Sequence, residues 1–361
     1  MKLVLAEQMT SRLAICQQDT WQPFSRVLIT DSCKFSLPDE YKDIYPGYGG
    51  AVTNSLMNIQ YSFDLKNGDW DNLELTKVTQ NDQSYSKSTT ERILKEDLHI
   101  RDLGYITMTY LREVTERQAF FLNRLQPKWK PINQTTGKAI EWPSLYTRMQ
   151  ANKETCFETP IILGSGKDKL QCRLIAIPVP EQVWVERVRK AQKQAKSRGR
   201  ALSEEYKERC RFSVFITNVD AAILKSADVA ELYRLRWQIE LIFKSWKSLL
   251  NLHRVKAVKK ERLECLLIAR FIWILLNWKI FRCLDVFIKK GNKDCACSHW
   301  KFFKQARISA PTLRMVMNHS ITLNTWLEIF IFPIMKSLLI EPKKDKKASF
   351  CIVNNIFSPL S

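Results

Sequence analysis

The segment that decides the fold reads Tyr233-Arg-Leu-Arg236-Trp-Gln-Ile-Glu240-Leu-Ile-Phe-Lys-Ser-Trp-Lys247. Its apolar residues recur at helical spacing, which predicts a helix with one face against a core. At about 100° per residue, four polar side chains lie within about 60° of one another at the edge of that face. They form a polar stripe, defined as Tyr233, Arg236, Glu240 and Lys247. We expect one long helix that begins near Asp228.

Upstream of this helix, two short β-like runs lead to acids. Arg26-Val-Leu-Ile-Thr-Asp31 predicts a strand with Asp31 at its C-terminal end, and Leu98 to Asp102 predicts a second. A plain alternative exists for Arg236 and Glu240, because an exposed i,i+4 ion pair contributes only a few tenths of a kcal/mol. That alternative leaves the two strand-terminal acids and the wide apolar face as coincidences. The pattern therefore favours a functional site.

On these residues, the sequence resembles the DDE transposases of the insertion sequence 4 family. The spacing of Tyr, Arg, Glu and Lys in the polar stripe matches the signature of that family, and the resemblance runs from about residue 20 to about 340. Asp31, in Leu-Ile-Thr-Asp-Ser-Cys, is similar to the first acid of the family, although Cys33 replaces the usual Thr. Asp102, in Arg-Asp-Leu-Gly-Tyr, is similar to the second acid. The resemblance implies that Asp31, Asp102 and Glu240 are catalytic and bind metal, and that Tyr233, Arg236 and Lys247 bind DNA.

The order of elements, strands before helices, predicts an α/β (α+β) fold with a mixed sheet flanked by helices. The resemblance implies a ribonuclease H-like catalytic core that is interrupted by a β-rich insertion. The separation of Asp102 from Glu240 is almost twice that of Asp31 from Asp102, which leaves room for this insertion. The expected divisions are a remnant of an N-terminal helical region (1–25), the first part of the core (26–130), the insertion subdomain (131–212), the second part of the core with the glutamate helix and C-terminal helices (213–340), and a basic tail (341–361).

Three converging carboxylates would repel one another unless divalent cations neutralised them. Hard oxygen ligands suit Mg²⁺ or Mn²⁺, and two such ions can support in-line displacement at phosphorus. The expected function is therefore that of a transposase: metal-dependent cleavage and strand transfer of an insertion sequence. A metal-dependent DNA nuclease without joining activity is one alternative. An N-terminally truncated, inactive DNA-binding remnant is another, because only about 25 residues precede the first catalytic strand.

Composition favours a polyanionic partner. Lysine and arginine number 57 against 37 acids, a formal charge of +20, which attracts phosphates and releases their counterions. The resemblance implies that this partner is double-stranded DNA (transposon ends and target), bound by a homodimer in the bacterial cytoplasm at the nucleoid. A basic helix at 183–200 is either a solvated face or a DNA contact. The apolar stretch 263–288 is interrupted by charged residues, so a buried helix or helix pair is expected there rather than a membrane span.

Overall fold

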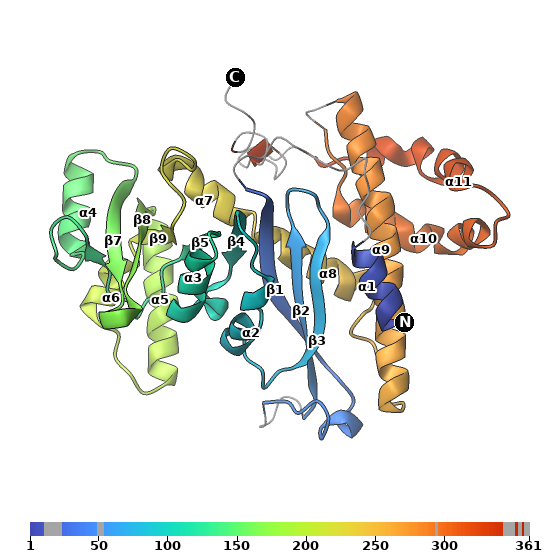
Figure 1. Ribbon diagram of the computed structural model, residues 1–361, viewed down its shortest axis with the longest axis horizontal. Coiled ribbons are helices and arrows are strands. Elements are labelled where there is room, and N and C mark those ends of the chain that lie inside the picture. Colours follow the sequence, from blue (N-terminus) through green and yellow to red (C-terminus); the bar gives the residue numbers. More distant parts are fainter. Residues whose placement is uncertain (11–23, 49–53, 293–294, 342–350, 353–355, 357–361) are drawn as a thin grey trace. The chain divides into compact units, whose positions relative to one another are not determined.

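The computed structural model describes residues 1–10, 24–48, 54–292, 295–341, 351–352 and 356. The chain has a mixed α/β architecture (Figure 1) and divides into two compact units. Unit 1 comprises Met1–Gln22, Leu28–Asn81 and Leu235–Ser361, and unit 2 comprises Pro23–Val27 and Asp82–Arg234. Asp31 and Glu240 therefore belong to unit 1, and Asp102 belongs to unit 2.

Unit 1 contains three antiparallel strands in the order β3-β2-β1. The turn between β2 and β3 forms at Asn67-Gly68, where Gly68 has a φ of +66° that favours glycine. Helices α9 and α1 pack against each other. The elements are α1 (Lys2–Thr10), β1 (Arg26–Ser36), β2 (Leu56–Asp64), β3 (Trp70–Lys77), α8 (Trp237–Ser248), α9 (Lys260–Gly291), α10 (His299–Met317) and α11 (Leu323–Phe330).

An aromatic cluster fixes helix α8 on the strands of unit 1. Tyr61 of β2 is fully buried, and its ring lies 4.9 Å from that of Trp246 and 6.0 Å from that of Phe243. Trp246 also contacts Trp70 of β3 and Phe271 of α9. Burial of each such side chain contributes roughly 1.5–3 kcal/mol. This packing fixes the edge of α8 that carries the polar residues.

Unit 2 contains a mixed sheet in the order β4-β5-β9-β8-β7-β6, in which β4 and β5 are parallel and the other neighbours are antiparallel. Side chains of α3, α4 and strands β5, β7, β8 and β9 share one hydrophobic cluster. The elements are α2 (Asp82–Ser88), β4 (Asp97–Arg101), α3 (Met108–Glu116), β5 (Phe120–Arg124), β6 (Ile132–Asn133), α4 (Trp142–Ala151), β7 (Phe157–Leu163), β8 (Leu170–Pro178), α5 (Glu181–Ser197), α6 (Glu204–Arg209), β9 (Phe212–Thr217) and α7 (Ser226–Arg234).

Several predictions on the ends and middle of the chain can be compared with these elements. The basic helix expected at 183–200 is α5, and the buried helix expected at 263–288 is the single helix α9. Strands β6 to β8 of the expected insertion join the sheet of unit 2 through β9, and the insertion boundaries stay a prediction. Most of the tail at 341–361, and residues 11–23 of the expected N-terminal remnant, lie outside the described residues. None of the helices in the described residues combines the length and apolar composition needed to cross a membrane.

Candidate active site

Asp31 lies in the middle of β1, directly opposite Tyr61 of β2. Opposed residues in a sheet point to the same face, so the Asp31 carboxylate shares the face on which α8 packs. The prediction that the strand ends at Asp31 is wrong: β1 continues to Ser36. It continues because residues 32–36 pair with 56–60 of β2, a long-range partner that the local sequence does not reveal. The backbone N–H of Ser32 donates to Asp31 Oδ1 at 2.8 Å.

Arg236 joins Asp31 to Glu240. Its Nη1 donates to Asp31 Oδ2 at 2.8 Å and its Nη2 donates to Glu240 Oε1 at 2.6 Å. The Arg236 and Asp31 side chains are mostly buried, at 12% and 17% exposed, whereas Glu240 is 38% exposed. The solvated i,i+4 pair considered above is therefore insufficient, because the same guanidinium also holds a carboxylate from a strand. We call Asp31 and Glu240 the acid pair.

Lys247 lies farther along α8 and contacts strand β1, the strand that carries Asp31. Its Nζ donates to the backbone oxygen of Lys34 at 2.7 Å. Burial raises the pKa of the neighbouring Cys33 thiol, and the positive charge of Lys247 offsets part of this rise. Cys33 is therefore a neutral, buried side chain beside the acid pair.

The single long helix predicted for the polar stripe is wrong. Helix α7 ends at Arg234 and α8 begins at Trp237, with a turn at Leu235 and Arg236. The N–H groups of Gln238 and Ile239 bond to carbonyls three residues back rather than four. Helix α7 begins at Ser226, two residues before the predicted start near Asp228.

This break separates Tyr233 from the other three stripe residues, because Tyr233 belongs to unit 2. Its ring lies 5.4 Å from that of Phe215 in β9, and its hydroxyl donates to the Arg101 backbone oxygen at 3.4 Å. Tyr233 therefore contacts the residue immediately before Asp102. The sequence pattern placed Tyr233 beside Glu240 on one helix and gave no sign of this second contact.

Asp102 follows the last residue of β4. The Arg101 carbonyl that precedes it also accepts a hydrogen bond from Asn123 Nδ2 at 2.9 Å, and Asn123 is fully buried. The Arg101 guanidinium is held by Ser86 Oγ at 3.1 Å and by the ring of Tyr110 at 4.2 Å. The sequence prediction that an acid follows a short strand here is confirmed. Its convergence with the acid pair stays a prediction.

The carboxylates of the acid pair suit a hard divalent cation by their chemistry. Each carboxylate already accepts a charge-assisted hydrogen bond from Arg236, whose single positive charge offsets part of the negative charge of the pair. The described residues contain no group of three or more His, Cys, Asp or Glu side chains placed to hold a metal. Cys297 and His299 are packing residues, because burial raises the pKa of the Cys297 thiol to about 12 and lowers that of His299 to about 3.

Comparison with known proteins identifies the family. Residues 22–276, which include all six predicted site residues, match the family model of the transposase DDE domain. The chain belongs to the bacterial insertion-sequence DDE transposases. It is similar to the transposase of insertion sequence element IS1151 from Clostridium perfringens, with 30% identity over 92% of this chain and 73% of the relative.

Two further relatives show how far the similarity extends. The transposase of IS231F from Bacillus thuringiensis subsp. israelensis is 29% identical over 75% of this chain, and the match covers 60% of that relative's length. The putative transposase InsL of IS186A from Escherichia coli is 29% identical over 49% of each chain. The family resemblance found in the sequence is therefore confirmed.

Proposed function

We propose that this DDE transposase catalyses metal-dependent cleavage of DNA and transfer of the freed end to a second strand. The observation that carries the proposal is the bridge from Asp31 through Arg236 to Glu240, which brings two of the three family acids together. Asp102 completes the set in the proposed ribonuclease H-like core. Double-stranded DNA, as transposon end and as target, is the proposed substrate, bound by a homodimer at the nucleoid.

The three carboxylates would hold two Mg²⁺ or Mn²⁺ ions, which supply Lewis-acid stabilisation of the attacking and leaving oxygens at phosphorus when bound. The chain's own residues offset negative charge and position the DNA and the acids. The planar guanidinium of Arg236 can bind a phosphate as well as a carboxylate. It can therefore release the acid pair and bind a DNA phosphate instead. Lys247 offers a point charge from the same helix, and Tyr233 fixes the backbone that precedes Asp102.

The test compares three variants, Asp31→Ala, Asp102→Ala and Glu240→Ala, on a supplied, pre-nicked transposon end with Mn²⁺. We expect each to abolish strand cleavage and strand transfer while DNA binding is nearly unchanged, because the acids contact metal rather than phosphate. Glu205→Ala, which removes an exposed carboxylate from α6, is the matched control and should cut normally.

Three results would contradict the proposal. Robust cleavage by the Glu240→Ala variant would remove the catalytic role of the acid pair. Complete inactivity of the unaltered chain, together with good DNA binding, would instead identify a DNA-binding remnant. Cleavage that never yields a joined product with target DNA would leave only the nuclease activity.

A further inference from the structure

Three arginines of unit 2 come from three different elements that meet near the C-terminal end of β5. Arg124 is the last residue of β5, Arg187 lies on α5, and Arg209 is the last residue of α6. We call these three residues the arginine cluster. Figure 1 shows α5 and α6 near β9, which is the neighbour of β5 in the sheet.

Hydrogen bonds to the backbone hold two of these side chains against the strand that carries the third. Arg187 donates to the Phe212 carbonyl and to Ser213 Oγ, both at 3.0 Å. Phe215 of β9 pairs with Arg124 of β5, so these two side chains face the same side of the sheet. Ser213 lies two residues before Phe215 and therefore faces that side as well. Arg209 donates to the backbone oxygen of Leu125, the residue after Arg124, at 2.7 Å.

The arginine cluster has no counter-charge from the described part of the chain: none of its members forms an ion pair with a carboxylate there. Arg211, nearby, differs because it pairs with Glu208 and with Glu181 at 2.9 and 3.1 Å. Arg209 Nε is buried without an acceptor. Burial lowers the pKa of Arg187, and repulsion from Arg124 lowers it further. An anion would accept hydrogen bonds from the half-buried Arg124 and Arg187 and relieve this repulsion.

The register of the two parallel strands relates this cluster to Asp102. Ile100 of β4 pairs with Leu122 of β5, and the same offset carried two residues further brings Asp102 beside Arg124. Arg124 is the last residue of β5 and Asp102 directly follows β4, so both residues lie at the carboxyl ends of neighbouring parallel strands, the edge where ligands bind in open α/β sheets. The cluster is therefore at the same edge of unit 2 as the predicted catalytic acid.

We propose that the arginine cluster binds a phosphate group of the DNA backbone next to Asp102. Arg124 and Arg187 are half-buried, so they remain accessible from solvent while their stems are held in place. Guanidinium groups bind phosphate oxygens in a bidentate manner, and such contacts orient a duplex without reading its sequence. The inference rests on the proposed function only for the identity of the polyanion as DNA.

The decisive variant is Arg124→Gln, because the Arg124 side chain forms no hydrogen bond or ion pair with other described residues and its removal should not disturb the fold. Binding of a random-sequence duplex is followed by fluorescence anisotropy between 50 and 200 mM salt in EDTA. Loss of one phosphate contact should lower the slope of log K against log salt by about 0.9 and reduce the salt-induced loss of affinity about 3.5-fold. The matched control is Lys190→Gln on α5, which removes one positive charge that already pairs with Glu186 at 2.6 Å.

The outcomes separate a positioned phosphate site from general charge. A smaller slope for Arg124→Gln than for Lys190→Gln, with recovery in Arg124→Lys, supports the site. Equal slopes for the two glutamine variants overturn it, as does an unchanged affinity of Arg124→Gln. Melting curves of all variants check the fold, and Arg187→Gln replaces Arg124→Gln if the latter is unfolded. Because the assay contains EDTA, failure of DNA cleavage would leave this result standing.

Discussion

The bridge at the acid pair makes a specific prediction for Arg236→Gln. This substitution removes a cation held by two charge-assisted hydrogen bonds, of 2.8 Å to Asp31 and 2.6 Å to Glu240. A buried hydrogen bond to a charged group contributes about 1.5–3 kcal/mol. The Asp31 bond is largely buried and should reach this range, whereas the Glu240 carboxylate is 38% exposed and its bond is discounted to below about 1 kcal/mol.

We therefore expect Arg236→Gln to lower the free energy of unfolding in EDTA by about 2–3 kcal/mol, which corresponds to a fall of about 3–4 °C in melting temperature for a chain of 361 residues. A divalent cation should reverse the effect. In the unaltered protein, metal must first displace the guanidinium from the two carboxylates, whereas in the variant the carboxylates are already released. Mn²⁺ should thus raise the melting temperature of the variant by more than that of the unaltered protein.

The assay is differential scanning calorimetry in EDTA and in excess Mn²⁺. The matched control is Lys247→Gln, which removes a positive charge from the same helix and breaks a bond to the Lys34 carbonyl rather than the two bonds to the acid pair. This control should show a small loss in EDTA and an ordinary response to Mn²⁺. An Arg236→Gln variant that melts like the unaltered protein in EDTA, or that gains no more from Mn²⁺, would refute the competition between arginine and metal.

Three further predictions follow from the charges and buried groups of the chain. With a formal charge of +20, the protein should bind duplex DNA with micromolar affinity and little sequence preference; binding that is equal at low and physiological salt would contradict this. Asn123→Ala should cost about 1–3 kcal/mol, because it removes the 2.9 Å bond to the Arg101 carbonyl; cleavage should fall while DNA binding in EDTA stays unchanged. His299 is neutral in the fold, with a pKa lowered to about 3 from 6.5. The unfolded chain therefore binds more protons than the folded chain below pH 6.5, and the free energy of unfolding should fall by about 2 kcal/mol between neutral pH and pH 5. Denaturant titration of His299→Phe should not show this loss.

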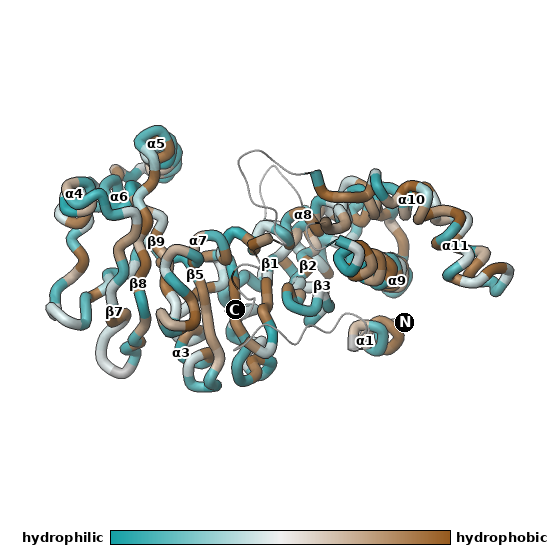
Figure 2. The backbone as a smooth tube through the Cα atoms, turned by 90° about the horizontal axis from the view of Figure 1, so that it is seen from above, coloured by the Kyte–Doolittle hydropathy of each residue, from teal (hydrophilic) through white to brown (hydrophobic). Residues whose placement is uncertain are grey.

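Local signals can predict the elements whose causes are local. The Asn67-Gly68 turn needs a positive φ that glycine supplies, and helix α3 begins where the Thr107 hydroxyl accepts the Tyr110 N–H at 3.1 Å. The full length of β1 could not be predicted in this way, because residues after Asp31 are extended only through pairing with β2. The arginine cluster was equally invisible: its members are far apart in the sequence and belong to separate elements (Figure 2).

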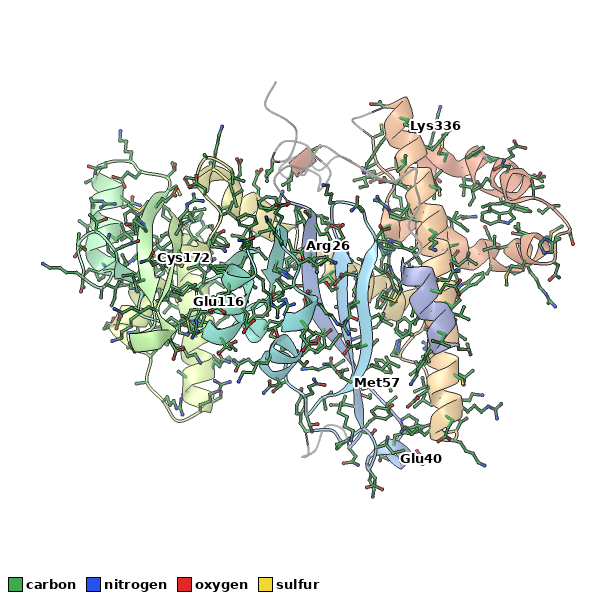
Figure 3. All side chains as sticks on the ribbon, viewed as in Figure 1. Arg26, Glu40, Met57, Glu116, Cys172 and Lys336 are labelled. Carbon is green, nitrogen blue, oxygen red and sulfur yellow. The ribbon has the colours of Figure 1, made fainter. Side chains whose placement is uncertain are left out.

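Side-chain packing also decides which charged residues are functional candidates. Figure 3 shows side chains over every element of the chain, with Arg26 near the start of β1. Arg26 donates to both oxygens of the buried Asp97 carboxylate, which gives this pair a structural role within unit 2. A sequence alone presents Arg26, Arg124 and Arg236 as equivalent basic residues. Their partners distinguish them. Arg26 pairs with a buried structural acid, Arg124 pairs with no described acid, and Arg236 pairs with two candidate metal ligands.

The spacing of the family signature now has a physical account that differs from a single helix face. Leu235 and Arg236 form a turn between two helices, so Tyr233 and Arg236 need not point in one direction. Tyr233 bonds to the carbonyl before Asp102 in unit 2, whereas Arg236 bonds to Asp31 and Glu240 in unit 1. The signature therefore contains Tyr233, which contacts the backbone before Asp102, and Arg236, which pairs with Asp31 and Glu240. On this argument, a residue inserted between Tyr233 and Arg236 should impair cleavage more than one inserted in the exposed Gly199 turn after α5, although both leave every acid in the chain.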